Sequence, residues 1–143
     1  MTLLEMLATL AILSMATVMF AVMTDRVGRR TGTIRFAERL ASDIRSARAD
    51  AIAKGDRIDI IFDVKDRAYA IDEEDFAVAP RDVRLEFTGA AEYFTESGAG
   101  VLRLYADGSS SGALIRIGSD REVDSIDVDW LTGSVRLTRE RRQ

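Results

Sequence analysis

The sequence predicts an α+β protein in which one long N-terminal helix packs on an antiparallel sheet or sandwich of about seven strands. Three observations carry this prediction. The chain opens with an apolar run, its hydrophobic period stays helical as far as Lys54, and apolar and polar residues alternate from Arg57 onward. The chain has 143 residues, which leaves room for one small domain after the apolar run.

The first segment, residues 1–24, is predicted to be a membrane-spanning helix. The 19 residues from Met6 to Thr24 carry no charge, and a helix of that length spans about 28 Å, close to the hydrocarbon thickness of a bilayer. A cleaved signal peptide would place basic residues before a shorter apolar run, whereas here the acidic Glu5 lies near the start. Because a carboxylate is costly at this depth unless it is paired, we expect Glu5 to meet a cation, such as the α-amino group of this or a neighbouring chain.

Residues 25–54 are predicted to continue the helix as an amphipathic segment. Gly28 and Gly32 soften its first part, and the alternative there is a flexible linker; the continuous helix is favoured because the next segment is strongly helical and no proline intervenes. Lys54-Gly55 is typical of a helix C-terminus. Apolar residues then recur every three or four positions, and we expect this stripe to pack on the sheet. The stripe is Phe36, Leu40, Ile44, Ala47 and Ala51; the opposite face, expected to be solvated, is Arg35, Glu38, Arg39, Asp43, Arg45, Arg48 and Asp50.

Residues 55–143 are predicted to form the globular antiparallel β domain. Alternation and turn residues predict three hairpins and one further strand, at residues 83–87. The hairpins pair 58–62 with 69–71, 102–104 with 114–117 across the turn Asp107–Gly112, and Ile126, Val128 and Trp130 with Val135 and Leu137. Residues 72–80 are predicted to be a loop, and residues 88–100 fit either a strand fragment or a loop.

Composition excludes most catalytic chemistry. The chain has no Cys and no His, so thiol nucleophiles, imidazole bases, disulfides and the common zinc sites are absent. The acidic run Asp72–Asp75 lacks the spacing of a calcium loop, and Asp107–Gly112 lacks the Lys of a phosphate loop. We therefore expect no enzymatic activity, no dedicated metal and no cofactor.

Charge is segregated along the chain. Residues 25–54 hold 8 basic and 4 acidic side chains, whereas residues 55–143 hold 12 basic and 19 acidic ones, a net charge of −7. The basic residues beside the apolar run do not by themselves decide on which side of a membrane the domain lies. The end of the chain is locally basic and fits either contact with DNA phosphates or simple solubilisation. Its four arginines are Arg136, Arg139, Arg141 and Arg142.

The N-terminal stretch Met1-Thr2-Leu3-Leu4-Glu5-Met6-Leu7, followed by Ala11-Ile12-Leu13, resembles the mature N-terminus of type IV pilins and type II secretion pseudopilins. Members of that family are made with a short basic leader. A prepilin peptidase cuts the leader after a glycine, and the new N-terminal residue, usually Phe, is methylated. The resemblance implies that Met1 is the processed and methylated residue, that Glu5 serves filament assembly, and that the β domain is periplasmic.

Three further blocks, residues 40–52, 105–112 and 128–136, resemble the GspH/FimT family of minor pseudopilins and minor pilins. This chain has Ala106 where the family often has Pro, and Ser134 where a basic residue is common. The resemblance implies a pilin-like fold and a non-catalytic subunit of the pseudopilus of a type II secretion system. Such a subunit is anchored by a single pass in the bacterial inner membrane and packs against major and minor pseudopilins through its N-terminal helix. The alternative is a FimT-like minor pilin of a type IV pilus, which would bind DNA for uptake through the four arginines.

Overall fold

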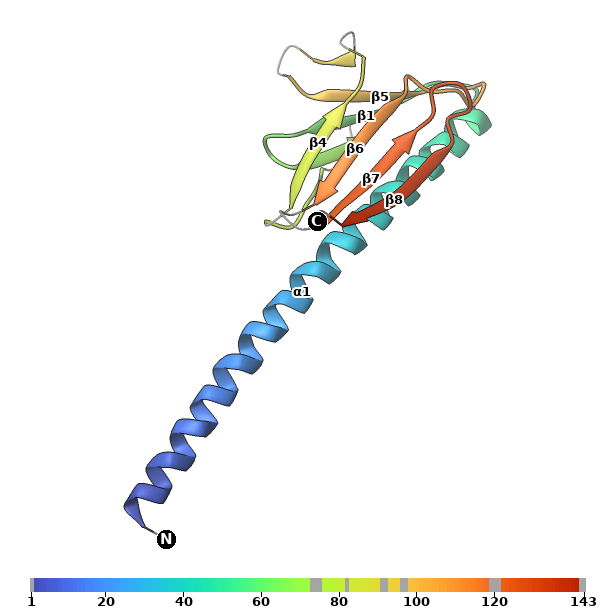
Figure 1. The fold of residues 1–143 in the computed structure, drawn as a ribbon. Coiled ribbons are helices and arrows are strands. Elements are labelled where there is room, and N and C mark those ends of the chain that lie inside the picture. Colours follow the sequence, from blue (N-terminus) through green and yellow to red (C-terminus); the bar gives the residue numbers. More distant parts are fainter. Residues whose placement is uncertain are drawn as a thin grey trace. The chain divides into compact units, whose positions relative to one another are not determined.

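The computed structural model describes residues 2–72, 76–81, 83–90, 93–95, 98–118 and 122–141, without the side chains of residues 21–30 and 141. In this part of the chain one helix precedes eight strands (Figure 1). They are α1 (Leu3–Lys54), β1 (Ile58–Asp63), β2 (Ala68–Ile71), β3 (Ala77–Val78), β4 (Arg84–Thr88), β5 (Gly100–Leu104), β6 (Ala113–Gly118), β7 (Glu122–Val128) and β8 (Val135–Arg141). The chain divides into two compact units, Met1–Gly32 and Thr33–Gln143.

Both ends of α1 are capped. Thr2 precedes the helix, and its Oγ1 accepts a hydrogen bond of 3.3 Å from the backbone N–H of Glu5. At the other end Gly55 adopts a φ of 69° and donates its N–H to the carbonyl of Ala51 at 3.0 Å. A positive φ is easy only for glycine, so the helix ends at Lys54, as Lys54-Gly55 predicted.

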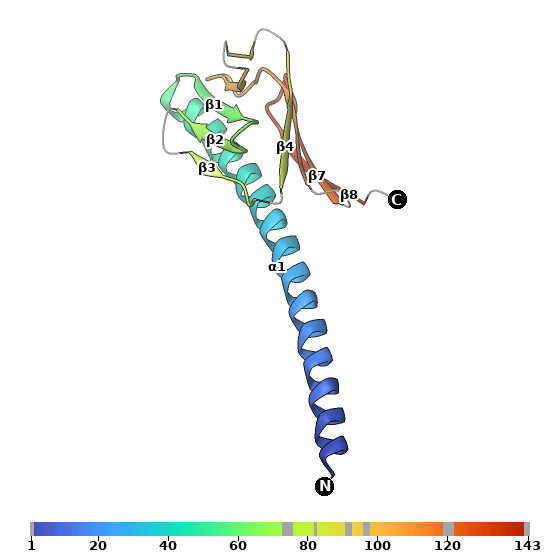
Figure 2. The ribbon, with the colours of Figure 1, turned by 90° about the vertical axis from the view of Figure 1, so that its left-hand side faces the viewer.

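In the unit Thr33–Gln143, the C-terminal part of α1 packs on two antiparallel sheets. The first sheet has the strand order β3-β2-β1-β5 and the second β4-β6-β7-β8, and Figure 2 shows β1–β3 and β4, β7 and β8 as two separate groups. The predicted apolar stripe of the helix is confirmed, since all five of its residues are buried in the core. The sheets add Ile58, Ile60, Phe62, Tyr69, Leu102 and Leu104 from the first, and Leu85, Ile115, Ile117, Ile126 and Val128 from the second.

Aromatic rings connect the helix to both sheets. Phe62 of β1 is fully buried and stacks on Tyr69 of β2, with ring centroids 6.2 Å apart, and on Phe87 of β4 in the second sheet, at 5.0 Å. Phe36 of α1 meets Tyr69 edge-on at 5.7 Å. The Tyr69 hydroxyl donates to the carboxylate of Asp43 at 2.5 Å, and burial together with this carboxylate raises the pKa of Tyr69 above its usual value.

The predicted hairpin of residues 102–104 with 114–117 is wrong. β5 pairs with β1, whereas β6 lies between β4 and β7 in the other sheet. The intervening loop does fold back locally, because Leu104 bridges to Ser110, but Gly112 at a φ of 71° then turns the chain toward the second sheet. Turn residues alone could not show to which sheet each strand belongs.

The other strand predictions fared better. The hairpins β1–β2 and β7–β8 and the strand β4 are confirmed. The predicted loop at residues 72–80 contains the short strand β3, although Glu73 to Asp75 lie outside the described residues. Of the ambiguous stretch 88–100, Phe94 bridges to Gly100, and residues 91, 92, 96 and 97 are not among the described ones. β7 ends at Val128, so Trp130, expected to alternate with Ile126 and Val128, is instead an exposed turn residue.

Candidate functional site

The surface of α1 from Leu3 to Phe20 is apolar and open. This stretch of 18 residues is long and apolar enough to cross a membrane, and none of it is buried within the chain. Soluble monomers rarely expose continuous apolar patches above a few hundred Å², so this surface requires lipid or other helices around it. The large exposed side chains are Leu3, Leu4, Met6, Leu7, Leu10, Ile12, Leu13, Met15, Val18, Met19 and Phe20.

Three hydroxyls in this stretch are already hydrogen-bonded to their own helix. Each donates to a backbone carbonyl three or four residues earlier, which removes most of the cost of placing a hydroxyl in hydrocarbon. The pairs are Thr9 with Met6 at 2.9 Å, Ser14 with Ala11 at 2.9 Å and Thr17 with Leu13 at 2.8 Å. The helix surface therefore suits an apolar environment in spite of its polar residues.

Glu5 occupies the third position of α1. Thr2 is the N-cap and receives the Glu5 N–H, so the spacing Thr2-x-x-Glu5 is that of a capping box. An acidic side chain in the first turn also interacts favourably with the helix dipole. This local role was not predicted, although the Thr-x-x-Glu pattern is itself sufficient to indicate it. Met1, whose α-amino group is the expected type of partner for Glu5, lies outside the described residues.

Arg136, Arg139 and Arg141 belong to the edge strand β8, which continues beyond the predicted Leu137 to Arg141. Alternation places Arg139 on the same side as Val135 and Leu137, which pack against the core, and Arg136 on the other side. The structure thus separates Arg136 from Arg139 instead of bringing them together. The Arg141 side chain and the whole of Arg142 are not described.

Arg139 is already engaged. Its Nε donates to Oδ1 of the buried Asp124 at 2.8 Å, across the β7–β8 pair, and this carboxylate raises the pKa of the guanidinium. A phosphate that approached Arg139 would have to compete with Asp124. Arg136 is exposed, as Arg139 is, and lies opposite Asp127 in the strand register.

Arg48 joins the helix to two turns. Its Nε donates to the carbonyl of Gly108 and its Nη2 to the carbonyl of Thr132, both at 2.8 Å. The two turns also approach each other closely, because a Cβ at Gly133 would lie 2.2 Å from the Gly108 carbonyl oxygen. The prediction that Arg48 lies on a solvated helix face is therefore wrong. The three sequence blocks 40–52, 105–112 and 128–136 meet at this one side chain.

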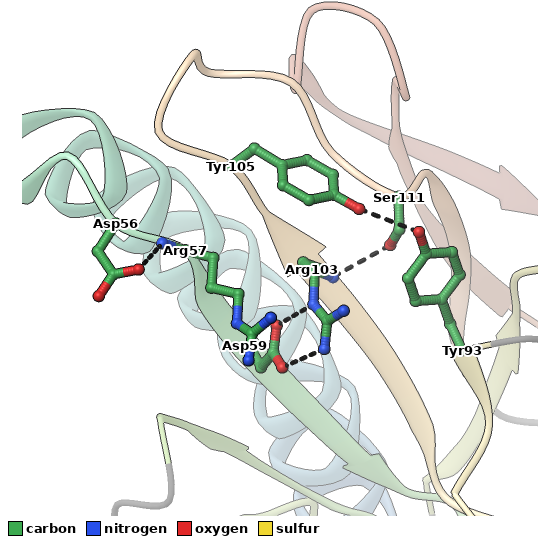
Figure 3. A network of polar contacts seen from close by, with 7 residues as sticks. All are labelled: Asp56, Arg57, Asp59, Tyr93, Arg103, Tyr105 and Ser111. Atoms are coloured by element: carbon green, nitrogen blue, oxygen red, sulfur yellow. Dashed lines mark hydrogen bonds and ion pairs between the residues drawn. The ribbon is translucent and has the colours of Figure 1, made fainter.

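A polar network on the first sheet involves Arg103 and is shown in Figure 3. Its guanidinium donates two hydrogen bonds of 2.8 Å to the carboxylate of Asp59, which raises the pKa of Arg103. The Arg103 N–H donates to Ser111 Oγ at 3.0 Å, and the hydroxyls of Tyr93 and Tyr105 lie 3.0 Å apart. The network ties β1 and β5 to the loop after β5. Among the described residues no group of three or more His, Cys, Asp or Glu side chains could hold a metal ion.

Comparison with known proteins gives both sequence and structural relatives. No family model matches the chain. Type II secretion system protein H of Xanthomonas campestris pv. campestris is 30% identical over 137 residues, which cover 94% of this chain and 80% of that protein.

Two solved structures share the fold. The minor pseudopilin EpsH from the Type 2 Secretion System of Vibrio cholerae has a TM-score of 0.61 at 14% identity, covering 75% of this chain and 96% of that one. The type IV minor pilin FimU of Pseudomonas aeruginosa has a TM-score of 0.53 at 16% identity, covering 76% of this chain and 90% of that one.

Proposed function

This chain belongs to the family of type II secretion system protein H, and we propose that it works as a minor pseudopilin, a non-enzymatic structural subunit of the pseudopilus. The observation that carries the proposal is the open apolar surface of α1 from Leu3 to Phe20, which includes the acidic Glu5 in its first turn. A structural subunit needs such a surface to join a bundle of helices. The chain has neither Cys nor His, so chemistry that depends on a thiol or an imidazole has no residue to perform it.

The apolar stretch first anchors the chain in the bacterial inner membrane and then packs against the corresponding helices of other pseudopilins, major and minor. Both environments are apolar, so the self-bonded hydroxyls of Thr9, Ser14 and Thr17 fit either one. Glu5 pairs with the α-amino group of a neighbouring subunit and thereby sets the axial register between adjacent helices. The domain formed by the two sheets lies in the periplasm.

Processing at Met1 tests this proposal. We expect a precursor with a short basic leader ending in Gly, removed by a prepilin peptidase, and a methylated Met1. The measurement is the intact mass, with fragmentation of the N-terminal peptide, of the full chain extracted from membranes. A strain without the peptidase should yield the longer precursor. A formylated or uncut N-terminus in the wild-type strain would contradict the assignment.

DNA binding is expected to be weak. The strand β8 presents Arg136 outward, but Arg139 is paired with Asp124, and residues 55–143 carry a net charge of −7. In mobility-shift titrations with duplex DNA, the fragment from Asp25 to Gln143 should bind no tighter than the non-specific range of about 10⁻⁴ to 10⁻⁶ M at physiological salt.

The matched variants for this titration are Arg136→Ala and a combined replacement of all four C-terminal arginines by Ala. If the chain serves secretion, neither variant should change the measured affinity for duplex DNA. Sub-micromolar binding that weakens steeply with salt and disappears in the fourfold variant would favour the DNA-uptake alternative instead.

A further inference from the structure

Three arginines follow the apolar run of α1 almost at once. They are Arg26, Arg29 and Arg30, and together with Asp25 they give residues 25–30 a net charge of +2. Residues 6–24, just before them, are uncharged, and residues 55–143 carry a net charge of −7. An anionic surface is therefore attracted to this short segment and repelled by the net charge of the β domain.

The three arginines share one face of the helix. The backbone of α1 is helical from Leu3 to Lys54, and residues spaced i, i+3 and i+4 are neighbours on a helix surface. Arg26, Arg29 and Arg30 have this spacing. Asp25 lies four residues before Arg29 and offsets one of the three positive charges at most, which leaves two for an external anion.

This face lies at the depth of the lipid headgroups when the apolar run is in a bilayer. At 1.5 Å per residue, Arg26 to Arg30 lie about 3 to 9 Å beyond Thr24 along the helix axis. A bilayer is about 40 to 45 Å thick and has a hydrocarbon core of about 30 Å, so each headgroup layer extends roughly 5 to 8 Å past the core. The arginines therefore overlap the layer that contains the lipid phosphates.

The expected orientation of the chain gives these arginines no role in directing insertion. Basic residues beside a membrane segment are normally in excess on the cytoplasmic side, whereas the proposed function places residues 25–143 in the periplasm. A local reason for the charges is therefore needed, and phosphate supplies one. A guanidinium stays charged at physiological pH and binds a phosphate group through two parallel hydrogen bonds.

We propose that Arg26, Arg29 and Arg30 bind the phosphates of anionic phospholipids while the chain is anchored in the inner membrane. The inference rests on the proposed function, because it requires the stretch Leu3–Phe20 to be in a bilayer. Anionic lipids are selected over zwitterionic ones, since the phosphate of a zwitterionic headgroup is already balanced by a cation of its own. Each arginine near the surface should favour an anionic lipid by about fivefold.

Energy transfer from the full chain to labelled lipids tests the inference. The chain has no Cys, so Val27→Cys gives a single site beside the arginines for an uncharged donor dye. The vesicles contain phosphatidylcholine and phosphatidylglycerol, with the acceptor on an acyl chain of one lipid or the other. At about 0.1 M salt, phosphatidylglycerol should be enriched around the helix by at least about fivefold, and the enrichment should fall as added salt screens the charges.

Two triple variants with the same change in net charge locate the effect. Replacing Arg26, Arg29 and Arg30 together by Gln should bring the enrichment close to one, and circular dichroism should show the same helix content, because Gln forms helices about as well as Arg. The matched control should keep the enrichment of the unaltered chain, since it removes three exposed charges from the unit Thr33–Gln143. It combines Arg57→Gln, Arg81→Gln and Arg116→Gln.

The outcomes separate this inference from the proposed function. Insertion of the chain without a preference for phosphatidylglycerol, or an equal loss of enrichment in both triple variants, would overturn the inference and leave the proposed function intact. Loss of the enrichment when millimolar inorganic phosphate replaces chloride at equal ionic strength would also overturn it, because the arginines would then bind free phosphate. Failure of the full chain to enter vesicles would overturn the membrane anchoring on which the proposed function itself depends.

Discussion

Replacing Glu5 by glutamine is expected to abolish secretion as completely as replacing it by alanine. Gln at the third helical position still completes a capping box with Thr2, so Glu5→Gln preserves the start of the helix and removes only the charge. If the carboxylate pairs with the α-amino group of a neighbouring subunit in an apolar bundle, its loss leaves that cation unpaired at a cost of several kcal/mol. Incorporation into the pseudopilus should then fall by more than about tenfold.

Thr2→Ala is the complementary variant. It removes the N-cap, which costs the helix about 1 kcal/mol, and keeps the carboxylate. We expect this variant to support near-normal secretion in a complementation assay, with amounts of membrane-bound chain equal for all three variants. Normal secretion with Glu5→Gln, combined with failure of Glu5→Ala, would reduce the role of Glu5 to capping.

Local pattern predicted the helix and its buried face well. The stripe from Phe36 to Ala51 and the end at Lys54 depend on neighbours within a few residues, and the structure has both. The position of Arg48 depends instead on which loops pass over the helix, and helical periodicity contains no such information. The same limit explains β5 and β6, because their partners lie in separate sheets and their shared turn looks like that of a hairpin.

Part of the candidate site could be predicted from the sequence. Glu5 stood out because an acidic residue is rare in an apolar helix, and its Thr2 cap is a short pattern that needs no fold. The pair Asp124–Arg139 follows from the register of the β7–β8 hairpin, in which Val128 lies opposite Val135 and Asp124 opposite Arg139. The turn was predicted correctly, but the strand register was not extended outward from it. Trp130 was misplaced because the alternation was extended past Asp129, which begins the turn.

Phe62→Ala is expected to cause the largest loss of stability in the domain. Phe62 is fully buried, and its ring stacks on Tyr69 in the first sheet and on Phe87 in the second. The substitution therefore removes this aromatic contact between the two sheets and leaves a cavity in its place. Truncation of a buried Phe lowers the free energy of unfolding by about 3 to 5 kcal/mol. For a domain of this size the melting temperature should fall by roughly 10 to 20 °C.

The neighbouring Ile61 provides the matched control for Phe62→Ala, because it points to the opposite face of β1 and is only half-buried. Thermal and urea unfolding of the fragment from Asp25 to Gln143, followed by circular dichroism, should show a loss of about 1 kcal/mol for Ile61→Ala. Phe62→Leu should fall between the two, since it keeps much of the buried volume and loses the ring stacking. A loss below about 1 kcal/mol for Phe62→Ala would mean that the two sheets are held together mainly through their separate contacts with α1, and that the aromatic stack contributes little.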